Sequence, residues 1–155
     1  MKMEMLTENL IEFSCNAHDK NELFDVVGKM DAAQGVVTGA SELKQALLNR
    51  EAEATTGLMD GFAIPHAKSD AVLEPTIVYI RCANPLAWET MDNSAVTDVF
   101  ALLVPMKNAG DLHLQLLSKL AVCLLDNEFK ENVRSSSDKS SFIAMVEEAL
   151  DKATL

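Results

Sequence analysis

Two runs of apolar residues in the middle of the chain place the strongest limit on its fold. Residues 76–80 read Thr-Ile-Val-Tyr-Ile, and residues 99–104 read Val-Phe-Ala-Leu-Leu-Val within a longer run over 96–106. Neither run alternates with polar residues, which is the pattern of a strand covered on both faces. Helical patterns lie before and after the runs. The sequence therefore predicts an α/β fold, in which helices pack on both faces of a small sheet.

The other periodic segments predict the elements that surround these strands. Apolar spacing predicts helices over 19–35, 41–50, 111–125 and 140–152, a short helical piece around Phe129, a short strand at 10–13 and an extended segment at 62–64. Pro85 and the turn residues 92–94 separate the two apolar runs, and Pro65 ends the extended segment. No internal repeat or long linker is present, so we expect one domain over residues 1–155.

The charge of the chain argues against several classes of partner. Its 155 residues include 24 acidic and 13 basic side chains, a formal net charge of −11. Nucleic acids and anionic membrane surfaces are bound through basic faces, and none is visible. The N-terminal residues lack the apolar core of a signal peptide, and no apolar run approaches the roughly 18 residues of a membrane span. We therefore expect a cytoplasmic protein with no nucleic-acid partner and no segment inserted in a membrane.

Cysteine and histidine spacing predicts neither a metal site nor a cofactor. Cys15, Cys82 and Cys123 are far apart in apolar contexts, so we expect buried, reduced thiols. The three histidines are also widely spaced, and His18 stands among polar residues as an expected solvated turn residue. Glycine-rich nucleotide loops and a nucleophile elbow are missing from the sequence. Cys82 has no base nearby in the sequence, which makes it a weak candidate nucleophile.

Residues 55–67 contain the best candidate for chemistry. The segment reads Thr-Thr-Gly-Leu-Met-Asp-Gly-Phe-Ala-Ile-Pro-His-Ala, so His66 directly follows the rigid Pro65. An imidazole changes charge near neutral pH and can act as a nucleophile. A loop that fixes one histidine is therefore a candidate reactive site. A loop histidine that only holds backbone groups fits the same residues.

Three more residues could assist His66. His113 lies in the first turn of an amphipathic helix, where backbone N–H groups favour a bound anion and a neutral imidazole. Arg50 stands at the end of the helix predicted over 41–50, and Thr56 follows shortly after. Together they supply cationic donors, a hydroxyl and imidazoles, which the handling of a phosphoryl group requires. His113 could equally be a histidine that only forms hydrogen bonds at a helix start, and Arg50 a surface arginine. The sequence does not show that the four residues meet in space.

The order of these motifs resembles that of the fructose/mannitol-type IIA proteins of the phosphoenolpyruvate-dependent sugar phosphotransferase system, including their nitrogen-regulatory relatives. The resemblance covers nearly the whole chain. It rests on Arg50-Glu51-Ala52 with Thr55-Thr56-Gly57, on Gly61-Phe62-Ala63-Ile64-Pro65-His66, and on His113-Leu114 with Leu116-Leu117-Ser118-Lys119-Leu120. Two positions depart from the family pattern: Ala54-Thr55 replaces a usual Gly-Ser pair, and Met59 stands where a small residue is common.

The resemblance implies a three-layer α/β/α sandwich with a small mixed sheet and a phosphocarrier function in sugar uptake. It implies that His66 accepts a phosphoryl group from the phosphohistidine of the carrier protein HPr and passes it to a cysteine of the IIB component. By the same comparison, His113 lies against His66 and stabilises the phosphoryl group, Arg50 neutralises its charge, and Thr56 hydrogen-bonds the active histidine or its phosphate. Contact with the IIC permease would be indirect.

Other functions fit the same motifs. Relatives in the nitrogen-regulatory branch bind partner proteins according to their phosphorylation state, and a degenerate binding module would keep the fold without the reaction. For the docking face that HPr and IIB would share, Phe62 and Met59 are candidate rim residues. The sequence does not identify the sugar, because specificity in such systems lies mainly in the membrane component.

Overall fold

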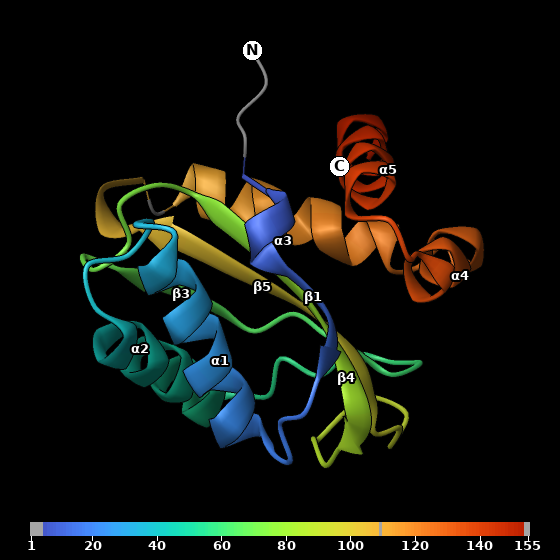
Figure 1. Cartoon of the computed structure of the whole chain (residues 1–155), viewed down its shortest axis with the longest axis horizontal. Coiled ribbons are helices and arrows are strands. Elements are labelled where there is room, and N and C mark those ends of the chain that lie inside the picture. Colours follow the sequence, from blue (N-terminus) through green and yellow to red (C-terminus); the bar gives the residue numbers. More distant parts are fainter. Residues whose placement is uncertain (1–4, 109, 154–155) are drawn as a thin grey trace.

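The sheet of this protein lies between two layers of helices (Figure 1). The computed structural model describes residues 5–108 and 110–153. The elements are η1 (Glu8–Leu10), β1 (Ile11–Cys15), α1 (Lys20–Ala33), α2 (Ala40–Glu53), β2 (Phe62–Ala63), β3 (His66–Ser69), β4 (Thr76–Leu86), β5 (Val96–Pro105), η2 (Met106–Asn108), α3 (Asp111–Cys123), α4 (Asn127–Ser135) and α5 (Lys139–Lys152). Helices α1 and α2 cover one face, and α3, α4 and α5 cover the other. None of the helices in this described part of the chain is long and apolar enough to cross a membrane.

Strand β5 organises the topology of the sheet. The strand order is β1-β4-β5-β2, and β3 also pairs with β5. Strand β4 runs antiparallel to β5, whereas the other pairings are parallel, so the sheet is mixed. Strands β2 and β3 pair with successive stretches of β5, with Phe62 opposite Asp98 and His66 opposite Leu102. This arrangement confirms the expected α/β/α sandwich and attaches His66 directly to a central strand.

Side chains of β4 and β5 alternate between two apolar cores. Val78 and Ala101 belong to the core formed with α1 and α2, whereas Tyr79 and Phe100 belong to the core formed with α3, α4 and α5. All four residues are fully buried. Because successive side chains of a strand point to opposite faces, a strand between two cores needs apolar residues at consecutive positions. The two apolar runs in the sequence follow from the position of their strands between the two cores.

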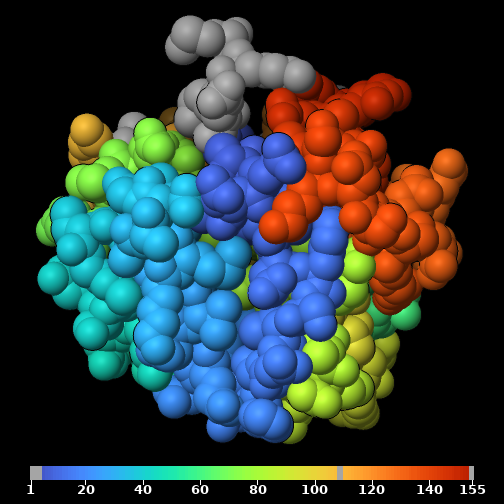
Figure 2. Space-filling view, in the orientation of Figure 1, coloured from blue at the N-terminus to red at the C-terminus, as the bar shows by residue number. Residues whose placement is uncertain are grey.

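The first and last described elements meet on one side of the molecule. Figure 2 shows η1, in blue, against α5, in red. Beside them, Phe13 of β1 packs edge-on against Phe142 of α5, with ring centroids 5.7 Å apart. Helix α5 starts after Asp138, whose carboxylate accepts the Ser141 N–H at 2.8 Å as an N-cap. These contacts close the α3–α5 layer over the sheet.

Three expected boundaries are wrong. Helix α2 does not end at Arg50 but continues to Glu53, so the arginine lies within its last turn. His66 begins strand β3 instead of lying in a loop. Strand β4 continues through Pro85 to Leu86, although proline was expected to separate the strands. Pairing with β5 is irregular across this stretch, which explains how a residue without an N–H is accommodated.

The three cysteines are free and buried, as predicted. Cys15 lies opposite Cys82 on the paired strands β1 and β4. Burial, the neighbouring Cys15 and Asp98 raise the pKa of the Cys82 thiol to about 12. A thiol that stays protonated is a poor nucleophile, so the structure agrees with a packing role for this residue.

Candidate active site

Three of the four predicted site residues converge from different elements. Arg50 comes from the last turn of α2, His66 from the start of β3 and His113 from the first turn of α3. They line a depression of about 330 Å³ whose other lining residues are Ala46, Asn49, Glu53, Ala67 and Lys68. The depression therefore combines two imidazoles with two cationic side chains.

His66 is held in a defined tautomer. Its Nδ1 lies 2.9 Å from the Ile64 carbonyl oxygen. Because a carbonyl can only accept, Nδ1 carries the hydrogen and Nε2 keeps its lone pair. The guanidinium of Arg50 donates from Nε to this Nε2 at 3.1 Å. Arg50 also donates from Nη1 to the Ala54 carbonyl at 2.8 Å. A nucleophilic nitrogen thus faces a fixed positive charge.

The surroundings of His66 favour a neutral imidazole. The side chain is only 6% exposed, and burial lowers the pKa of His66 below its ordinary value of 6.5. The Ile64 carbonyl and the charge of Glu51 raise this pKa, whereas the positive charges of Arg50 and Lys68 lower it; the net direction is downward. At neutral pH the ring is therefore available as a nucleophile instead of being protonated.

His113 packs against His66 without a hydrogen bond between the two rings. The ring centroids are 5.2 Å apart, with 50° between the ring planes. Burial lowers the pKa of His113 to about 4, and the charges of His66, Lys68 and Arg50 act in the same direction. Within the described residues, Nδ1 of His113 is buried without a hydrogen-bond partner. Buried polar atoms are usually hydrogen-bonded, so this nitrogen is an exception within the site.

A glycine starts the helix that carries His113. Gly110 has φ of +93°, a backbone conformation that side-chain-bearing residues rarely adopt. It is the N-cap of α3 and has no side chain with which to cap the first N–H groups. The first N–H groups of α3 are therefore left without a side-chain cap, and His113 lies in the same first turn, near the positive end of the helix dipole.

Thr56 is placed differently from the sequence-based expectation of direct contact with the histidine. Its hydroxyl donates to the Glu51 carboxylate, at 2.8 and 3.0 Å from the two oxygens. Its carbonyl accepts the Ile64 N–H at 3.1 Å. Thr56 is buried and is not among the residues that line the depression. The structure therefore links Thr56 to His66 through Ile64, and a direct bond to a phosphate stays a prediction.

Sequence reasoning missed two residues of the site. Glu51 accepts hydrogen bonds from Thr56 and from the Trp88 indole, yet in the sequence it was only part of a motif. Lys68 lies two positions beyond His66 on β3, so both side chains point to the same side of the strand. The spacing of two residues between His66 and Lys68 is visible in the sequence. It indicates a shared side only in a strand, whereas a loop was expected here.

The structure also bears on the expected docking face, on His18 and on metal binding. Phe62, a candidate rim residue of a docking face, is fully buried in the core with α3, α4 and α5, so that expectation is wrong. Met59 is half-buried, which leaves it a prediction. His18 is a surface residue, with its side chain 75% exposed beside Glu22. Within the described residues, no group of three His, Cys, Asp or Glu side chains is arranged to hold a metal ion.

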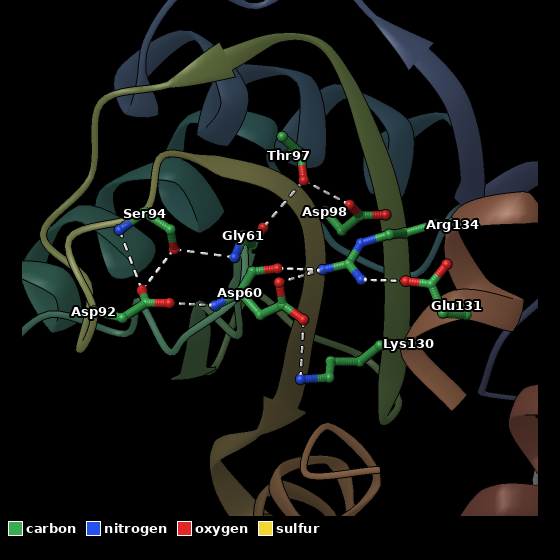
Figure 3. A network of polar contacts seen from close by, with 9 residues as sticks. All are labelled: Asp60, Gly61, Asp92, Ser94, Thr97, Asp98, Lys130, Glu131 and Arg134. Atoms are coloured by element: carbon green, nitrogen blue, oxygen red, sulfur yellow. Dashed lines mark hydrogen bonds and ion pairs between the residues drawn. The ribbon is translucent and has the colours of Figure 1, made fainter. Parts of the chain in front are cut away.

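A second polar network fixes the segment before His66 at its other end (Figure 3). The Asp60 carboxylate pairs with Lys130 at 3.1 Å and with Arg134 at 3.2 Å, both on α4. The Asp60 N–H donates to Asp92 at 2.9 Å, and Ser94 accepts the N–H of the next residue at 3.0 Å. The turn before β2 is thereby attached to α4 and to the loop before β5.

Known proteins share this sequence pattern and fold. The sequence pattern of the family described as "Phosphoenolpyruvate-dependent sugar phosphotransferase system, EIIA 2" matches residues 4–149. The fructose-specific EIIA component of Haloferax volcanii is 38% identical over 106 residues, which is 68% of each chain. The fructose-specific EIIABC component of Bacillus subtilis is 29% identical over 144 residues, which is 92% of this chain but 22% of that protein.

A solved structure supports the same relationship. The crystal structure of the nitrogen regulatory protein IIA-Ntr from Neisseria meningitidis superimposes with a TM-score of 0.85 at 29% identity. The match covers 92% of this chain and 97% of that one. The relatives therefore include proteins named for sugar transport and a protein named for nitrogen regulation.

Proposed function

The chain belongs to the EIIA 2 family of the phosphoenolpyruvate-dependent sugar phosphotransferase system, and from this premise we propose that it is a phosphocarrier whose reactive atom is Nε2 of His66. In this proposal, phospho-HPr donates the phosphoryl group, and a cysteine of a IIB component receives it during sugar uptake. The observation that supports it most is the geometry of His66: Nδ1–H is bound to the Ile64 carbonyl, while Nε2 faces Arg50 in an open depression.

The transfer can be written with the groups at hand. Arg50 first releases the lone pair of Nε2, to which its Nε–H donates in the free protein. Nε2 of His66 then attacks the phosphorus as the N–P bond to the donor histidine breaks, and no proton has to leave Nε2. The ring becomes positively charged, and the Ile64 carbonyl stabilises its Nδ1–H. Arg50 and Lys68 lie beside the position of the phosphoryl oxygens and offset their charge. In the second step a cysteine thiolate attacks the phosphorus, and the Nε2–P bond breaks.

Transfer between two nitrogen atoms makes modest chemical demands on the protein. A phosphoryl transfer transition state is catalysed mainly by positioning and by neutralising charge. The site supplies both, because His66 is fixed by a hydrogen bond and a β-ladder, and the cationic groups are already in place before a phosphoryl group arrives. His113, packed against the ring, is proposed to steady the phosphoryl group between the two steps.

A labelling experiment tests the proposal. The protein is incubated with phosphoenolpyruvate, enzyme I and HPr, and the acid-labile phosphate is mapped. We expect one phosphate on the wild-type chain, none on His66→Ala, and full labelling of the control His18→Ala, which changes an exposed histidine. Labelling that survives His66→Ala would refute the assignment.

Regulation is the second candidate function. The IIA-Ntr structure superimposes over 97% of its own length with a TM-score of 0.85 at 29% identity, and that protein is named for nitrogen regulation. Phosphorylated protein mixed with a purified fructose-specific IIB domain separates the two. Rapid loss of the phosphate to the IIB cysteine supports the transport role. Retention of the phosphate, with partner binding that differs between the two forms, supports the regulatory role.

A further inference from the structure

A continuous chain of hydrogen bonds connects Glu51 with the ring of His66. The Glu51 carboxylate accepts the Thr56 N–H at 2.8 Å and the Thr56 hydroxyl at 2.8 Å. The Thr56 carbonyl accepts the Ile64 N–H at 3.1 Å. The Ile64 carbonyl in turn accepts from Nδ1 of His66 at 2.9 Å. Thr56 and Ile64 each take part in two successive links, one through the N–H and one through the carbonyl, so the backbone of these two residues connects Glu51 with the imidazole.

Glu51 is also the neighbour of Arg50 in the last turn of α2. The helix ends at Glu53, and the next residue, Ala54, already has an extended backbone. Arg50 is anchored by donating to the Ala54 carbonyl at 2.8 Å. Because Glu51 holds the N–H of Thr56 two residues further on, it limits where the Ala54 carbonyl can lie. The same carboxylate thus constrains both partners of the Arg50–His66 contact.

The Glu51 carboxylate is itself held in place. The single tryptophan of the chain, Trp88, donates from its indole Nε1 to it at 2.9 Å. The ammonium of Lys20, at the start of α1, lies 3.9 Å from the same oxygen and 5.0 Å from the centroid of the indole ring. Only 6% of the Glu51 side chain is exposed. A carboxylate with so many donors is buried at low cost and has little freedom to move.

We propose that Glu51 is a positioning residue for phosphoryl transfer on His66, an inference that rests on the function proposed above. It does not touch the reacting atoms. It fixes the Nδ1 acceptor through Thr56 and Ile64, and it fixes the guanidinium of Arg50 through the end of α2. Thr56 also has a role in this proposal, because it joins the carboxylate to Ile64, two residues before the histidine.

The negative charge of Glu51 gives the role an electrostatic signature. It opposes the effect of Arg50 and Lys68, raising the pKa of His66 against the downward pull of burial and of the two cations. Removing this charge should therefore lower the pKa of His66 further. Removal of Glu42, which is not among the groups that shift the pKa of His66, should leave that titration where it is.

The test compares Glu51→Ala and Glu51→Gln with Glu42→Gln, which removes an exposed charge from the other end of α2. We expect the turnover rate for labelling of His66 by phospho-HPr to fall about 100-fold in Glu51→Ala and about 10-fold in Glu51→Gln, with KM for phospho-HPr unchanged. The glutamine variant retains one acceptor oxygen, so it rescues part of the rate. Glu42→Gln should behave as wild type.

Two physical readouts accompany the rates. A proton NMR titration should show a lower His66 pKa in both Glu51 variants than in wild type, and Trp88 fluorescence should change because its acceptor changes. Wild-type rates and an unshifted His66 titration in folded Glu51→Gln would overturn the proposal, as would an equal loss in Glu42→Gln. If Glu51→Ala does not fold, Glu51→Gln decides. Lack of labelling in wild type would instead refute the proposed function, while the titration would still test the positioning.

Discussion

Two carboxylates hold opposite ends of the segment between α2 and β3, and they do so in different ways. Glu51 is nearly buried, and its closest partners are neutral donors: a backbone N–H, a hydroxyl and an indole. Asp60 is 52% exposed, and its side chain pairs with the cations Lys130 and Arg134 (Figure 3). Hydrogen bonds lead from the first carboxylate to His66, whereas ion pairs lead from the second to α4.

The difference separates positioning from attachment. Hydrogen bonds from neutral donors to a buried carboxylate have narrow geometry, which suits a group that must present one nitrogen accurately. Ion pairs tolerate movement of long side chains and join two elements of the fold. We therefore expect changes on the Glu51 side to alter transfer and changes on the Asp60 side to alter stability.

The largest loss of stability should come from breaking the Asp60 side. Asp60→Asn leaves the Lys130 ammonium, whose side chain is only 6% exposed, without its counter-charge. We expect a loss of about 2 kcal/mol in the free energy of unfolding, measured by urea denaturation with Trp88 fluorescence. Labelling of His66 at 25 °C should be unchanged. Glu131→Gln, which removes an exposed partner of Arg134, is the matched control and should cost less than about 0.5 kcal/mol.

The contribution of Asp60 should also have a defined pH window. The hydrogen bond from Lys130, and then that from Arg134, lower the pKa of this carboxyl below 3.8. Its stabilising effect is therefore present above that value and is lost as the pH falls through the lowered pKa. A large drop in labelling by Asp60→Asn under conditions where the protein is folded would break the proposed division between the two networks.

His113→Ala sharpens the comparison from the reactive side. The ring packs against His66 but makes no hydrogen bond to it in the structure, and Arg50 holds Nε2. We expect labelling by phospho-HPr to persist and onward transfer to the IIB cysteine to slow about tenfold, measured by single-turnover kinetics. Complete loss of labelling would instead assign His113 an essential role in the first step.

The smallest effect on transfer should come from a carboxylate that belongs to neither network. Asp31 of α1 is fully buried, and among the described residues neither of its carboxylate oxygens has a hydrogen-bond partner. Burial raises its pKa from 3.8 to about 7. The folded protein binds the extra proton in this window, so Asp31 lowers stability as the pH rises from about 4 to about 7.

Removing that charge should remove its cost. We expect Asp31→Asn to be more stable than wild type at pH 8, and by a smaller margin at pH 5, measured by thermal unfolding at both pH values. The rate of transfer should stay the same. A stability difference that does not vary with pH would contradict a role for the buried charge.

Much of this fold could be predicted because it depends on local patterns. The runs at 76–80 and 99–104 are apolar at consecutive positions because their strands lie between two cores, and this pattern alone indicated helices on both faces. The convergence of Arg50, His66 and His113 followed from motif resemblance, and the depression they share agrees with it. The spacing of these three residues along the sequence does not by itself predict that they meet in space.

The remaining features depend on contacts between distant segments. Thr56 was expected at the histidine, but its hydroxyl meets Glu51 because α2 continues past Arg50 and places this carboxylate within reach of residue 56. Phe62 looked like a surface residue beside the reactive segment, yet its strand pairs with β5 and turns the ring into the core. Neither outcome can be derived from propensity or periodicity, since both depend on where the helix ends and which strand pairs.

The most direct test of the account is the identity of the phosphorylated atom. The ¹⁵N-labelled protein is phosphorylated with phosphoenolpyruvate, enzyme I and HPr, and its imidazole nitrogens are observed by long-range ¹H–¹⁵N NMR. The account predicts the phosphorus on Nε2 of His66, with Nδ1 still protonated against the Ile64 carbonyl. Phosphate on Nδ1 of His66, on another residue, or on none would contradict it.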